Sequence, residues 1–66
     1  MNVIVNGEPR EFPEPLTVSG LLKELMLEPR KIAIERNLEL VPKSAFDDIA
    51  LHEGDRIEIV QFVGGG

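Results

Sequence analysis

The chain has 66 residues, with 7 basic and 12 acidic side chains and a formal charge of -5 at pH 7. It has no cysteine and one histidine, which excludes disulfides and thiolate chemistry and argues against a zinc site. The acidic balance would repel a phosphate backbone, so nucleic-acid binding is not expected. A hydrophobic fraction of 42% suffices for one small core.

The beginning of the chain lacks the basic start and apolar core of a signal peptide. No apolar run approaches the roughly 20 residues that a membrane-spanning helix needs. We therefore expect a cytoplasmic globular protein that does not bind membranes.

The chain opens with a pattern typical of a β-hairpin. Residues 1–5 are rich in β-branched side chains, and Asn6-Gly7 favours the positive φ angles of a type I′ turn. Residues 10–12 are predicted to return as a second strand, which Pro13 ends because proline cannot donate to a ladder.

A single helix is predicted next, capped by the Thr17 hydroxyl. Apolar residues recur with helical spacing and predict one buried stripe, which consists of Val18, Leu21, Leu22, Leu25 and Met26. Pro29 is expected to end this segment. Gly20 is unfavourable inside a helix, and a close approach of the helix to a sheet would explain it.

Three further strands are predicted, over residues 31–35, 38–41 and 56–63. Asn37 marks the turn between the first two, and Ser44 is expected to cap a brief helical turn. The order is therefore β-β-α-β-β-β. It predicts an α+β fold of the ubiquitin-like β-grasp type, a mixed sheet of four to five strands around one helix. Residues 1–63 would form this domain, with the first and last strands parallel at its centre.

The chain offers little with which to build an active site of its own. His52 beside Glu53 is expected to be an ordinary surface residue, and Ser44 a cap. Asp47 and Asp48 are adjacent, so on a helix their carboxylates would diverge. We predict that the protein is not an enzyme and holds no metal or cofactor.

Residues 64–66, Gly64, Gly65 and Gly66, are predicted to form a flexible C-terminal tail. Without side chains it could enter a channel too narrow for other residues, and it could reach about 10 Å beyond the last strand. Its carboxylate is ionised at neutral pH. It could attack the α-phosphate of ATP held by another protein. A frayed terminus without function is the alternative.

A docking patch is predicted at the base of this tail. If Ile57 and Ile59 face the helix, strand alternation places Val60 and Phe62 on the open face of the sheet. The same alternation turns Ile4 outward on the first strand. Exposed apolar patches often bind partners. The alternative is that Phe62 folds over an edge as part of the core.

Several segments together resemble the ThiS family of sulfur carriers in thiamine biosynthesis, in order and spacing, over the whole chain. They are Val3-Ile4-Val5-Asn6-Gly7-Glu8, Thr17-Val18, Ile34-Glu35-Arg36-Asn37, Glu39-Leu40-Val41-Pro42-Lys43-Ser44, Gly54-Asp55-Arg56-Ile57-Glu58-Ile59 and the final Gly65-Gly66. One departure is Leu38, where many family members have glycine, so the turn type there is left open.

The resemblance implies three partners. An E1-like adenylyltransferase (ThiF) would activate the Gly66 carboxyl with ATP, which the partner binds. A cysteine desulfurase, or another persulfide donor, would supply sulfur to form a thiocarboxylate. Thiazole synthase (ThiG) would then accept that sulfur. Two alternatives stay open: a sulfur carrier for molybdopterin, cysteine or methionine formation, and a non-covalent ubiquitin-like adaptor.

Overall fold

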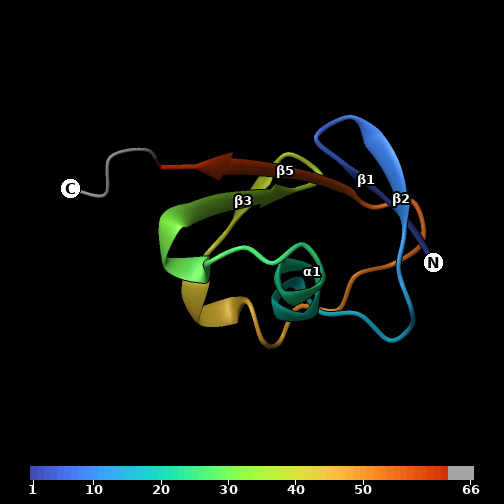
Figure 1. Ribbon diagram of the computed structural model, residues 1–66, viewed down its shortest axis with the longest axis horizontal. Helices are drawn as coiled ribbons and strands as arrows, with labels where there is room; N and C mark the ends of the chain where they lie inside the picture. Colours follow the sequence, from blue (N-terminus) through green and yellow to red (C-terminus); the bar gives the residue numbers. More distant parts are fainter. Residues whose placement is uncertain (63–66) are drawn as a thin grey trace.

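The computed structural model describes residues 1–62, so Val63 and the predicted tail at 64–66 lie outside the described residues. One helix packs on one face of a five-stranded sheet with the strand order β2-β1-β5-β3-β4 (Figure 1). Within the described residues, no helix is long and apolar enough to cross a membrane.

The first hairpin joins β1 (Asn2–Val5) to β2 (Glu8–Glu11) in antiparallel register. The turn residues Asn6 and Gly7 have φ angles of 49° and 84°, which confirms the predicted type I′ turn. β2 begins before the predicted residue 10 and includes Pro9. An edge strand tolerates this proline because one side of its backbone needs no ladder bond.

The helix α1 (Val18–Glu24) begins as predicted, with the Thr17 hydroxyl accepting from the Gly20 amide at 3.1 Å. A close approach of the helix to the sheet was the reason expected for Gly20. The structure shows a different reason. A β-carbon there would lie 3.3 Å from Leu16 Cδ1, so the crowding comes from the segment before the helix.

The prediction that Met26 belongs to the buried stripe is wrong. The helix ends before it, and Met26 has a φ of 59° and is 91% exposed. The Leu27 amide donates to the Leu22 carbonyl at 2.9 Å, and the Met26 amide donates to the Lys23 carbonyl at 3.1 Å. These two bonds form a Schellman motif, in which the residue at the Met26 position takes the left-handed conformation.

The second hairpin follows a short 3-10 turn, η1 (Pro29–Lys31), and joins β3 (Ile32–Arg36) to β4 (Glu39–Val41). Asn37 and Leu38 have φ angles of 51° and 71°, so this turn is also type I′ despite the leucine. The predicted capping by Ser44 is wrong. Ser44 lies inside a second 3-10 turn, η2 (Lys43–Ala45), whose N-cap residue is Pro42, and no side chain caps the turn.

The last strand, β5 (Arg56–Gln61), is the middle strand of the sheet. It pairs in parallel with β1 and antiparallel with β3, which confirms the β-grasp prediction. Between helix and sheet lies one apolar core, formed by Val3, Val5, Phe12, Leu16, Val18, Leu21, Leu22, Ile32, Ile34, Val41, Phe46, Leu51 and Ile57.

Candidate functional site

The central strand leads directly into the predicted tail. On the β3 side, β5 is held as far as Phe62, whose backbone amide donates to the Lys31 carbonyl at 2.7 Å. Four residues follow Phe62 in the sequence, Val63 and then three glycines. The predicted modified residue Gly66 and the tail residues Gly64 and Gly65 all lie outside the described residues. The structure therefore describes the chain that precedes the tail as far as Phe62.

An apolar patch lies on the face of the sheet opposite the helix. Val60 and Phe62 are 58% and 54% exposed, and Leu40 on β4 is 70% exposed. Val60 pairs with Ala33, and Leu40 pairs with Glu35, so all three strands contribute to one surface. We call the set Ala33, Leu40, Val60 and Phe62 the open-face patch. Ala33 and Leu40 were not predicted as part of a patch, because only the register between strands places Ala33 beside Val60 and Leu40 on the same face, beside Glu35.

The Phe62 ring forms one wall of a groove at the edge of this patch. The groove has a volume of about 210 Å³, and Ala33, Leu40 and Phe46 also line it. The Lys43 ammonium lies 5.7 Å from the centre of the Phe62 ring, within range of a cation–π contact. Phe62 therefore rests against the surface without being buried in the core.

The structure does not bring Ile4 together with the other two residues of the predicted patch. Ile4 is half-buried and lies opposite Arg56, at the start of β5. On the same face of that strand, Glu58 stands between Arg56 and Val60. Alternation along a strand predicts the face of a residue, whereas its position along the sheet depends on the register between strands. Docking by any of these residues stays a prediction.

Two carboxylates of like charge face each other beside the open-face patch. Glu35 on β3 and Glu58 on β5 are directly paired across the two strands, and both are exposed. Like charges at such a pair destabilise a sheet. They also place two negative charges side by side next to the patch, which favours a basic group of a partner at that point.

A buried carboxylate fixes the start of β5, at the end remote from the tail. Asp55 is 8% exposed and accepts hydrogen bonds from the His52 amide at 2.8 Å, Asn37 Nδ2 at 3.1 Å and Arg36 Nε at 3.1 Å. Burial alone would raise the pKa of Asp55, but these bonds and the Arg36 charge together lower its pKa below the usual value. This network has a structural role, because none of its buried side-chain polar atoms lacks a hydrogen-bond partner.

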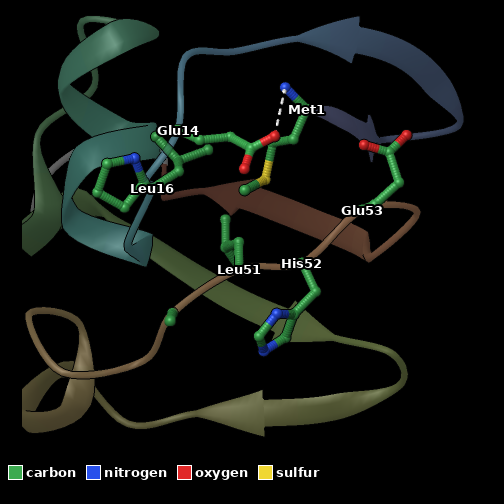
Figure 2. A pocket seen from close by; sticks show the side chains of 8 residues that line it. Met1, Glu14, Leu16, Leu51, His52 and Glu53 are labelled. Atoms are coloured by element: carbon green, nitrogen blue, oxygen red, sulfur yellow. Dashed lines mark ion pairs between the residues drawn. The ribbon is translucent and has the colours of Figure 1, made fainter.

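A cavity with a volume of about 300 Å³ lies at this same end, which is remote from the predicted tail (Figure 2). Leu16 and Leu51 line it, and the Met1 amino group lies 3.7 Å from the Glu14 carboxylate. The His52 ring projects away from this ion pair in Figure 2. In residues 1–62, no three histidine, aspartate or glutamate side chains gather as metal ligands would.

The fold and the central strand together define a ubiquitin-like β-grasp protein, in which the middle strand continues into a glycine-rich end. The chain matches the ThiS family model over residues 3–66. It therefore belongs to the ThiS family.

Similarity to several named proteins supports this assignment. The chain is 52% identical over 66 residues to a thiazole synthase of Paramagnetospirillum magneticum. It is 42% identical over 50 residues to the sulfur carrier protein ThiS of Bacillus subtilis, a match that covers 76% of each chain. The crystal structure of the thiamine biosynthesis protein ThiS from Geobacter metallireducens superposes with a TM-score of 0.85 and 36% identity, over all of both chains.

The length of the match differs between these relatives. This chain is covered completely in the comparison with the Paramagnetospirillum protein, but it spans only 20% of that thiazole synthase. The same share, 20%, holds for a thiazole synthase of Magnetococcus marinus that is 41% identical. In both, a sequence like this one is a fifth of a larger protein.

Proposed function

We propose that this chain is a sulfur carrier of thiamine biosynthesis, whose Gly66 carboxylate is the working group. The observation that carries the proposal is the path of β5, which runs through the middle of the sheet and is followed directly by Val63, Gly64, Gly65 and Gly66. Membership of the ThiS family and the named Bacillus carrier support it.

The first proposed step takes place on an E1-like adenylyltransferase (ThiF). A carboxylate oxygen of Gly66 attacks the α-phosphorus of ATP, pyrophosphate leaves, and an acyl-adenylate forms. The ATP is held by the partner, and the carrier supplies only the end group. Glycines suit this step because a tail without side chains fits a narrow channel.

The second step exchanges the activated oxygen for sulfur. A persulfide from a cysteine desulfurase attacks the acyl-adenylate, AMP leaves, and an acyl disulfide forms. A thiol then reduces the disulfide and releases the thiocarboxylate. Thiazole synthase (ThiG) accepts this sulfur. The two relatives named thiazole synthase support such a partner, because a sequence like this one is part of each.

The open-face patch is the docking surface in this proposal. Its members Val60 and Phe62 lie at the end of β5 and directly after it, shortly before the tail in the sequence, so a partner that covers them receives the tail at a fixed place. The facing pair Glu35 and Glu58 lies beside the patch and favours a partner with lysine or arginine there. Such a partner would also relieve the repulsion between the two carboxylates.

Intact-protein mass spectrometry tests the proposal. The carrier is incubated with ATP, its adenylyltransferase, a cysteine desulfurase, cysteine and a thiol reductant. The expected product is heavier by the replacement of one oxygen by sulfur, and omission of ATP should abolish it. An unchanged mass in the complete system would contradict the proposal. The Gly66 carboxyl must be free, so the same measurement on protein from its native host should show a chain that ends there.

Deletion of Gly65 and Gly66 separates covalent carriage from non-covalent adaptor function. The shortened chain should keep its fold, since the described core ends before these residues. It should support no thiocarboxylate formation and no thiazole synthesis. Thiazole synthesis by the shortened chain at the normal rate would instead favour the adaptor.

A further inference from the structure

The last part of β5 extends beyond the end of its parallel neighbour β1 (Figure 1). Backbone pairing between the two strands reaches Val5 and Ile57 and stops there, because the chain turns at Asn6. On the other side, β3 pairs with β5 as far as Gln61. Without a further contact, the backbone amide and carbonyl of Ile59 would be unpaired on the β1 side of β5, just before the predicted tail.

The side chain of Asn6 occupies this edge. Its Oδ1 accepts a hydrogen bond from the Ile59 amide at 2.7 Å, and its Nδ2 donates to the Ile59 carbonyl at 3.2 Å. The Asn6 backbone amide donates to the Ile57 carbonyl at 2.8 Å. These bonds imitate one more residue of a β-ladder. Between described residues, they are the last that β5 makes on this side.

Packing beneath this part of β5 is incomplete. A hollow of about 240 Å³ lies between the end of the helix and the strand, and Leu25, Leu27 and Ile59 line it together with Asn6. Ile59 is half-buried, whereas Ile57 is buried. The hydrogen bonds of Asn6 therefore hold a part of β5 whose helix-facing side is only partly packed.

A second asparagine, Asn37, makes comparable hydrogen bonds at the other end of β5. Asn37 is also the first residue of a type I′ turn, with a φ of 51° against 49° for Asn6. Its Oδ1 accepts from the Arg56 amide at 2.9 Å, and its backbone amide donates to the Arg56 carbonyl at 2.8 Å. The two asparagines differ in their distance from the tail and in one further bond, because Asn37 Nδ2 also donates to the buried Asp55 carboxylate at 3.1 Å. Asn37→Ala is therefore the more disruptive change to the domain, and a larger effect of Asn6→Ala on activation cannot come from loss of stability.

We propose that Asn6 is a positioning residue for tail activation. It fixes the end of β5 so that the tail points into the nucleotide site of the adenylyltransferase when the sheet docks. This inference rests on the proposed carrier function, and Asn6 itself forms no bond to the reacting groups. Loss of the hydrogen bonds between Asn6 and Ile59 lowers the fraction of carriers whose tail is correctly directed. The apparent affinity of the adenylyltransferase for the carrier falls by the same factor.

The test compares Asn6→Ala with Asn37→Ala in ATP–pyrophosphate exchange by the cognate adenylyltransferase. Both changes place alanine at a similar positive φ and remove side-chain hydrogen bonds to β5. For Asn6→Ala we expect the KM for the carrier to rise roughly tenfold with kcat within about twofold of the wild-type value. For Asn37→Ala both constants should stay within about twofold. Circular dichroism at the assay temperature verifies that both variants are folded.

Asn6→Asp adds a readout that general destabilisation would not give. The introduced carboxylate can still accept from the Ile59 amide, but its second oxygen faces the Ile59 carbonyl and cannot donate. Protonation restores a donor at that position. The KM of this variant, divided by the wild-type KM at the same pH, should therefore fall as the pH is lowered from 7 toward the ordinary aspartate pKa of about 3.9.

Each outcome is decisive. If wild-type carrier supports no pyrophosphate exchange, the proposed function fails, and the role of Asn6 fails with it. If the wild type is active but Asn6→Ala and Asn37→Ala raise KM equally, or if the KM ratio of Asn6→Asp does not change with pH, the positioning role alone is refuted. A tenfold effect confined to kcat would also refute it, because it would place Asn6 in the chemical step.

Discussion

Replacement of Phe62 by aspartate would place a carboxylate in the open-face patch. An aromatic side chain presents 150–250 Å² to its surroundings, so the 54% exposed fraction leaves roughly 100 Å² for a partner to cover. At about 25 cal/mol per Å², that area corresponds to about 2.5 kcal/mol of binding free energy. Its loss should weaken binding to the adenylyltransferase roughly 60-fold.

The fold should survive this change. Phe62 lies after the last described strand, outside the buried core, and its ring contributes one cation–π contact with Lys43. That contact accounts for about 0.5–1 kcal/mol at an exposed site. The 54% exposed fraction also leaves roughly 90 Å² of the side chain covered in the groove, which corresponds to about 2 kcal/mol, so the free energy of unfolding should fall by no more than about 3 kcal/mol. Isothermal titration calorimetry measures the binding, and urea denaturation measures the stability.

A matched control comes from Met26, which is also apolar and 91% exposed but lies at the end of the helix. Met26→Asp adds the same charge away from the open-face patch and should leave the affinity within about twofold of wild type. Equal losses for the two variants would mean that net charge, and not the patch, governs docking. Global unfolding of Phe62→Asp would refute the placement of Phe62 on an open surface.

Two other properties of the described residues are testable. Leu38→Gly and Met26→Gly should each raise the free energy of unfolding by about 0.5 kcal/mol in urea titrations, because relief of the left-handed conformation exceeds the entropy cost of glycine; a loss of stability would show that these side chains contribute packing. The lowered pKa of Asp55 means that its stabilising contribution is complete above its unfolded pKa of about 3.9 and is lost as the pH falls through the folded pKa. Asp55→Asn should therefore be less stable at pH 7 and show a shallower loss of stability below pH 4 than wild type, whereas equal slopes would exclude Asp55 as a source of acid sensitivity.

The elements of the fold were predictable because their signals are local. Asn6-Gly7 fixes the first turn, Thr17 the start of the helix, and the alternation in residues 56–61 the face of each β5 side chain. The end of the helix was not predictable in the same way. Met26 continues the apolar period, but the Schellman bonds that end the helix before it depend on the three-dimensional path of Leu27 into the core.

The site was only partly predictable, because its parts meet through register. Val60 and Phe62 follow from alternation within one strand, whereas Ala33 and Leu40 join them through pairing across β3 and β4. The same dependence separates Ile4 from them. Asn6 was recognisable as a turn residue, but its bonds to Ile59 join positions 53 residues apart in the sequence. No local pattern indicates such a contact.

The central position of β5 has a consequence for when the carrier becomes usable. The hairpin of β1 and β2 and the hairpin of β3 and β4 join one sheet only through β5, which is made after both. Before β5 inserts, the two hairpins cannot complete the sheet, and the open-face patch does not exist. In the proposed function, an adenylyltransferase that recognises the face of β5 would therefore bind only chains whose sheet is complete, and ATP would be consumed only on folded carriers.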